Sequence, residues 1–231
     1  MTPFDFAMIT GLGVGSDPIP LDPDMGEWVA AWDVLLGARP PLARAGMVRC
    51  CWFKEHYRGE DPETDEGVDQ YVRGFLLFLF GTTMFSNRWN TVGLYFLSTL
   101  VLLPRVHSHN WGAAGLTTLY GYMSSTSRIR GRLIGGYWRA WELWVYAHFP
   151  ALAPDPVEET AVTVPFSDVY DGPPRRRTRK GFMFFRQYFD TVAAGEITWR
   201  PWEVIPSGLQ DRYRVAQIMS QYRILFEGPI Y

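Results

Sequence analysis

Four segments of the sequence decide the fold: RGFLLFLFGTTMFSN (residues 73–87), NTVGLYFLSTLVLL (90–103), WGAAGLTTLYGYMSSTSR (111–128) and IGGYWRAWELWVYAHF (134–149). Each is rich in apolar and aromatic residues and is set off by glycine, proline or polar residues, which is typical of helices that pack into a core. The same segments contain almost no acid, base or nucleophile. They therefore predict a packed, mainly α domain and indicate no reaction.

The composition favours a single domain over residues 1–231. Of the 231 residues, 47% are hydrophobic and 16% aromatic, which is enough to bury a sizeable core. The net charge of −2 provides no overall field that would attract nucleic acid or an anionic membrane. The longest apolar windows, residues 75–80 and 92–103, are shorter than the roughly 20 residues that a membrane span needs. We expect no membrane association.

Helix start and stop signals predict the remaining elements. Thr2 and Pro3 are typical of a helix start, and Gly11 ends that helix. Residues 12–22 predict a turn or small hairpin, and residues 197–199 are expected to pair with 224–226 as short strands. Further helices are predicted over residues 27–36, 41–57, 67–80, 91–103, 111–128, 132–149, 180–194 and 210–220. The expected fold is a compact multi-helix domain with small β-hairpin elements near the N-terminus and the C-terminus.

Two other patterns concern the core and the surface. Aromatic and apolar residues recur every three or four positions in residues 132–149, and we interpret that stripe, which includes Trp138, Trp141 and Trp144, as core. Cys50 and Cys51 are interpreted as core cysteines. Residues 150–178 are rich in proline and are predicted to form an exposed loop.

None of the patterns examined for catalysis fits. His107 and His109 offer two imidazoles without the third or fourth ligand that zinc requires. The glycines at positions 11, 13 and 15 have the wrong spacing for a dinucleotide fingerprint and no preceding strand. A pyridoxal enzyme would need a Schiff-base lysine, and neither Lys54 nor Lys180 has a suitable context. We expect no catalytic, metal or cofactor-binding residues and no enzyme activity.

A basic run is the charged feature with the most functional promise. It consists of Arg175, Arg176, Arg177, Arg179 and Lys180. Such a run can contact phosphates or act as a nuclear-import signal, and it can equally be a solvated loop. Cations at the start of the helix predicted next oppose its dipole, which favours a function. The alternatives of import and nucleic-acid binding stay open, the latter with help from Arg128, Arg130 and Arg132.

An ordered set of segments resembles the plant mobile domain, a domain family that is found in plant nuclear proteins and is also carried by plant transposable elements. The segments are ITGLGVGSDPIPLD (residues 9–22), RGFLLFLFGTTMFSN (73–87), NTVGLYFLSTL (90–100), WGAAGLTTLYGYMSSTSR (111–128), GGYWRAWELWVYAHFP (135–150) and WRPW (199–202), so the likeness covers nearly the whole chain. The resemblance implies a largely helical domain without established catalytic residues, although the label aminotransferase-like is attached to the family. It also implies roles in transposon or gene silencing and in meristem maintenance, partly in complexes with a phosphatase-like protein of the same family. Longer members of the family continue beyond both ends of this sequence. The resemblance therefore allows the chain to be a truncated copy from a mobile element.

We therefore hypothesise a nuclear, non-catalytic protein-interaction domain. Its partner is expected to be a protein, with a phosphatase-like member of the family as one candidate. Tryptophan is enriched at the energetic centres of interfaces, so tryptophans outside the long central helices are the candidate partner surface. They are Trp28, Trp32, Trp89, Trp199 and Trp202. The alternative hypothesis is a nucleic-acid-binding module that uses the basic run.

Overall fold

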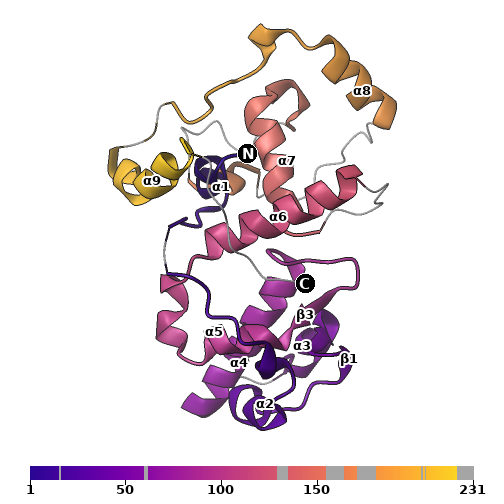
Figure 1. The fold of residues 1–231 in the computed structure, drawn as a ribbon, viewed down its shortest axis with the longest axis vertical. Coiled ribbons are helices and arrows are strands. Elements are labelled where there is room, and N and C mark those ends of the chain that lie inside the picture. Colours follow the sequence, from indigo (N-terminus) through magenta and orange to yellow (C-terminus); the bar gives the residue numbers. More distant parts are fainter. Residues whose placement is uncertain are drawn as a thin grey trace. The chain divides into compact units, whose positions relative to one another are not determined.

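The chain is mainly α, as the sequence predicts (Figure 1). The computed structural model describes residues 1–15, 17–59, 62–128, 135–154, 164–170, 181–203, 205 and 207–222. Within these, the α-helices are α1 (Pro3–Thr10), α2 (Val29–Leu36), α3 (Cys50–His56), α4 (Asp65–Thr82), α5 (Leu97–Leu100), α6 (Trp111–Arg128), α7 (Trp138–His148), α8 (Phe182–Thr191) and α9 (Ser207–Met219). The strands are β1 (Leu42–Arg44), β2 (Met47–Arg49) and β3 (Thr91–Gly93). Short 3-10 helices cover Pro23–Gly26, Leu94–Phe96, Leu103–Ser108, Pro150–Leu152, Phe166–Tyr170 and Ala194–Glu196.

The elements group into two compact units. Unit 1 comprises Met1–Val14 and Arg139–Ile224, and unit 2 comprises Gly15–Trp138 and Leu225–Tyr231. The prediction of one domain over the whole chain stays a prediction.

Unit 2 is built around α4. This helix packs against α2, α3, α5 and β3, and Thr64 caps it by accepting a hydrogen bond from the Gly67 N–H at 3.1 Å. Asp65 and Glu66 lie in its first turn, where acidic side chains are favourable. The buried face of α4 meets an aromatic cluster in which the Phe85 ring stacks on Phe96 at a centroid distance of 4.6 Å.

The small sheet of unit 2 lies where two helices were predicted. The strands are antiparallel in the order β1–β2–β3, so the predictions of helix over residues 41–49 and 91–93 are wrong. Gly46 turns the chain with a φ of 63°, a value that favours glycine. Met47 and Val48 are then buried against β3. Of the turn or small hairpin predicted for residues 12–22, the described residues contain no hairpin: the chain bends at residues 14 and 15, where Gly15 has a φ of 101°, and Asp17 forms an isolated bridge to His109.

Unit 1 has α1 at its centre. Thr2 and Asp5 form a capping box at its start, and α1 packs against α9 and the 3-10 helix Phe166–Tyr170. The ring of Phe149, which follows α7, packs edge-on against the ring of Phe189 on α8, with a distance of 5.2 Å between the ring centroids. No described helix has both the length and the apolar character that crossing a membrane requires.

Several predictions for unit 1 are corrected. The stripe predicted as core in α7 is not its most buried face: Ala140, Leu143 and Ala147 are buried, whereas Trp138 is exposed. Residues 197–199 form no strand, and their predicted partners 224–226 lie outside the described residues. The predicted loop 150–178 contains two 3-10 helices in its described part, and Leu152 is buried. In unit 2, Cys50 is buried as predicted, but Cys51 is exposed.

Candidate functional site

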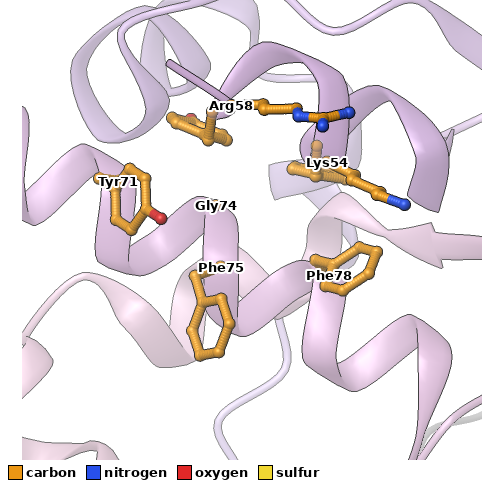
Figure 2. A pocket seen from close by; sticks show the side chains of 8 residues that line it. Lys54, Arg58, Tyr71, Gly74, Phe75 and Phe78 are labelled. Atoms are coloured by element: carbon orange, nitrogen blue, oxygen red, sulfur yellow. The ribbon is translucent and has the colours of Figure 1, made fainter. Parts of the chain in front are cut away.

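A pocket in unit 2 lies between α3 and α4. It has a volume of about 410 Å³. We call it the α3–α4 groove, and it is lined by Phe53, Lys54, Tyr57, Arg58, Tyr71, Gly74, Phe75 and Phe78. Figure 2 shows the α4 residues Tyr71, Phe75 and Phe78 along one side, with Lys54 and Arg58 on the other.

Close packing between Tyr57 and Gly74 fixes the base of the groove. The Tyr57 ring lies directly on Gly74, where any Cβ would overlap it. Its hydroxyl donates a hydrogen bond to the Leu36 carbonyl oxygen at 2.8 Å. Burial raises the pKa of Tyr57, partly offset by the charge of Arg73. The phenol therefore remains neutral near neutral pH and positions the groove.

The α4 wall of the groove includes Tyr71 and Phe75, which belong to a longer exposed apolar stripe of that helix. Val68, Tyr71, Phe75 and Leu79 are separated by three, four and four residues, so they lie on one face of the helix. That face is open to solvent, and Phe75 is 51% exposed. Arg73, Gly74, Leu77, Phe80 and Gly81 are the buried residues of the same helix. Hence α4 has a second, exposed apolar face in addition to the face that packs against the core.

Two cations lie opposite this wall. Lys54 and Arg58 are both exposed, and the ion pairs recorded among the described residues all join other side chains. A groove with aromatic rings on one side and cations on the other suits a peptide that has apolar anchors and acidic neighbours. The groove thus provides binding surface, and the groups that line it do not form a nucleophile–base arrangement.

A second polar site lies in unit 1 around the buried carboxylate of Asp5. It accepts hydrogen bonds from the Thr2 N–H at 2.7 Å, the Trp202 indole N–H at 2.9 Å and the Trp144 indole N–H at 3.2 Å. His148 Nε2 lies 3.9 Å from the carboxylate, a distance for an ion pair rather than a hydrogen bond. Burial raises the pKa of Asp5, but His148 and the hydrogen bonds outweigh it and lower the pKa to about 2.

This Asp5 site is structural. Its donors come from the start of α1, from α7 and from the 199–202 segment, so one carboxylate joins three parts of unit 1. The Thr2, Trp144 and Trp202 N–H groups all find their acceptor in this carboxylate, whereas the buried His148 Nε2 has no hydrogen-bond partner and is only within ion-pair distance of it. No group of three or more His, Cys, Asp or Glu side chains in the described part of the chain is arranged to hold a metal ion.

The five candidate tryptophans differ in their exposure to solvent. Trp28, Trp89 and Trp199 are exposed. Trp32 and Trp202 are buried, so they cannot form a partner surface: the Trp32 indole N–H donates to the Met25 carbonyl oxygen at 2.8 Å, and that of Trp202 to Asp5. Arg175, Arg176, Arg177, Arg179 and Lys180 lie outside the described residues.

Sequence reasoning missed the α3–α4 groove because it treated α4 as wholly core. A detectable signal was present: residues 75–80 are apolar without interruption, and such a run places apolar side chains all round a helix. A helix at the surface of a small unit can bury only part of that circumference. The excess apolar face therefore indicates a binding surface.

Comparisons with known proteins agree with the likeness seen in the sequence. The family model of the plant mobile domain matches residues 1–225. The chain is 26% identical to "Protein MAIN-LIKE 2" of Arabidopsis thaliana over 231 residues, which is 96% of this chain and 34% of that protein. It is 27% identical over 209 residues to "Protein MAIN-LIKE 1" of the same plant, covering 86% of this chain and 40% of that protein.

A further relative is the Arabidopsis thaliana "Serine/threonine-protein phosphatase 7 long form homolog". It is 25% identical over 194 residues, which is 76% of this chain and 14% of that protein. The chain thus spans 40% or less of the length of these curated relatives. No solved structure matches it.

Proposed function

This chain belongs to the plant mobile domain family, and we propose that it is a non-catalytic protein-interaction domain of a nuclear plant protein. The process that we propose is transposon or gene silencing and meristem maintenance, either in a host factor or in a transposable element that carries the domain. The support for silencing is the family resemblance. The support for an interaction role is physical and comes from the α3–α4 groove.

The exposed apolar stripe of α4 is the observation that carries the interaction role. Tyr71 is 40% and Phe75 51% exposed, on a helix whose opposite face is already packed. Burying a fully exposed side chain of this size contributes roughly 1.5–3 kcal/mol. Because about half of each ring is already covered, a partner gains roughly half of that from each ring, before the entropy lost on association is subtracted. Two such rings beside a pocket are the usual composition of an interface centre.

The partner that we propose is another protein. A phosphatase-like member of the same family is the first candidate, because one of the relatives that share the domain is named as a phosphatase homologue. Lys54 and Arg58 favour a segment of that partner with acidic residues next to its apolar anchors.

Substitution in the groove is expected to reduce partner binding at least tenfold. The changes are Tyr71→Ala and Phe75→Ala, each of which removes an exposed ring from the centre of the proposed interface. Tagged wild-type and variant chains are expressed in plant cells, and nuclear proteins recovered with each are quantified by mass spectrometry. The affinity of any recovered partner, and of the phosphatase-like relative, is then measured with purified proteins.

Phe182→Ala serves as the matched control, since Phe182 is a 76% exposed phenylalanine of α8, outside the groove. It should leave recovery unchanged, and all variants should keep the wild-type thermal unfolding midpoint. Undiminished binding by both groove variants contradicts the proposal. Loss of binding in Phe182→Ala alone moves the partner surface to α8.

The nucleic-acid alternative based on the basic run of residues 175–180 stays a prediction. A chain with neutral residues at positions 175, 176, 177, 179 and 180 tests it by measuring the affinity for nucleic acid that this change removes.

A further inference from the structure

Charge is strongly segregated along the sequence, which the net charge of −2 conceals. Residues 70–141 contain seven arginines and no Asp or Glu, and residues 34–54 contain three arginines and one lysine with no Asp or Glu. In unit 2 these two stretches form all three strands and α6. The sheet and α6 are thus built without a single carboxylate side chain.

Two of these arginines meet at one exposed tryptophan. The Arg88 guanidinium lies 3.5 Å from the centroid of the Trp89 ring, and that of Arg44 on β1 lies 5.7 Å from it. Burial raises the pKa of Tyr122 on α6, and the charges of Arg44 and Arg88 act against that rise, so both cations also lie near this phenol. We call these four side chains the Trp89 face.

The backbone beneath the Trp89 face is held in place. The Asn87 side-chain oxygen accepts from the Trp89 N–H at 3.0 Å, and its amide nitrogen donates to the Thr91 carbonyl oxygen at 2.6 Å. Asn90 adopts a φ of 52°, and its carbonyl oxygen accepts from the Cys50 N–H at 2.9 Å. The loop is therefore fixed to the start of α3 and to β3, which reduces the entropy lost when a ligand binds.

The two arginines are available to an external anion. Arg44, Arg88 and Trp89 are exposed, and the ion pairs recorded among the described residues involve neither arginine. A guanidinium stacked on an indole keeps its N–H edges free to donate to phosphate oxygens, and its outer plane can receive a nucleobase.

From this arrangement we propose that the Trp89 face binds single-stranded nucleic acid. Arg44 and Arg88 contact backbone phosphates, and Trp89 with the Arg88 plane stacks against an unpaired base. The site is separate from the α3–α4 groove in residues and in ligand class, and it goes beyond the proposed protein-interaction function.

Single strands fit this face better than a duplex. The exposed aromatic and cationic groups sit on a short loop and a three-residue strand, whereas base readout in duplex DNA uses a helix or strand ribbon that enters a groove. An unpaired base exposes its flat face, which a protruding tryptophan can stack on regardless of sequence. DNA and RNA single strands share this chemistry.

The test is fluorescence anisotropy with labelled dT12, rU12 and a duplex of equal phosphate number. For two phosphate contacts on a single strand, the logarithmic salt slope is about −1.4, so affinity falls about sevenfold between 50 and 200 mM salt. Arg44→Ala with Arg88→Ala should flatten this slope. Trp89→Ala should weaken binding about tenfold at constant slope, and Trp89→Phe should restore most of the affinity because a ring is retained.

The controls separate this site from others. Arg105→Ala, at an exposed arginine of the 3-10 helix Leu103–Ser108, should leave binding unchanged. A chain with neutral residues at 175, 176, 177, 179 and 180 should keep the Trp89-dependent component. Equal affinity for the duplex, binding lost only when the basic run is neutralised, or no binding at 20 mM salt would each overturn the proposal. A dT12 and rU12 comparison identifies which strand is preferred.

Discussion

Asp5→Ala is expected to destabilise unit 1 by about 3 kcal/mol or more. The Asp5 carboxylate accepts hydrogen bonds from Trp144, Trp202 and the Thr2 backbone, and it is 8% exposed. Removing it leaves the buried Trp202 indole N–H and two partly buried N–H groups without their acceptor. A buried donor without an acceptor costs about 1–3 kcal/mol, and a partly buried one costs less. Urea unfolding followed by tryptophan fluorescence measures the loss. Asp211→Ala, at an exposed carboxylate of α9 in the same unit, should not move the midpoint.

The same carboxylate predicts a specific loss of stability in acid. The pKa of Asp5 is lowered from 3.8 to about 2 on folding, so its ionised form stabilises the fold above pH 4. That contribution, about 2 kcal/mol, disappears as the pH falls from 4 through 2. In Asp5→Asn, this part of the pH dependence should be absent. An unchanged acid profile in Asp5→Asn would show that Asp5 is not the group responsible.

Phe85→Ala is expected to reduce the free energy of unfolding by about 3–5 kcal/mol, the usual cost of emptying a buried phenylalanine site. Phe85 is 1% exposed and sits between Phe80 and Phe96, with its ring stacked on the latter. These rings come from α4, the segment after it and the 3-10 helix Leu94–Phe96, so relaxation into the cavity is limited.

Thermal and urea unfolding of Phe85→Ala and Phe182→Ala provide a matched pair. Both remove a phenyl ring, but Phe182 is 76% exposed and its loss should change stability by less than about 0.5 kcal/mol. A similar loss in the two variants would contradict the assignment of the Phe80–Phe85–Phe96 cluster as the core of unit 2.

Local signals were enough for some elements and not for others. The bounds of α6, residues 111–128, follow from a helical pattern that Asn110 starts by accepting a hydrogen bond from the Ala113 N–H at 3.1 Å. Thr2 and Gly11 likewise define α1. By contrast, β2 exists because it pairs with β3, more than 40 residues away in sequence, and short apolar runs do not by themselves distinguish a strand from a helix.

The candidate sites were harder to foresee because they depend on distant residues. The sequence identifies Asp5 as a helix-capping residue, which it is. The two indole N–H groups that donate to its carboxylate belong to Trp144 and Trp202, which lie 139 and 197 residues away in sequence. Trp202 was consequently placed at the surface when the fold buries it. Phe75 was predicted in the core although it is exposed. The apolar run that contains it does not reveal which face of α4 remains uncovered.

Site-specific photocrosslinking tests the central claim most directly. A benzophenone amino acid replaces Phe75 in the α3–α4 groove, and a second chain carries it at Phe182 as the control. Irradiation in plant nuclei is expected to link position 75 to a protein partner, with the cross-link suppressed by adding Lys54→Glu and Arg58→Glu. If position 75 gives no cross-link while position 182 does, the α3–α4 groove is not the partner surface.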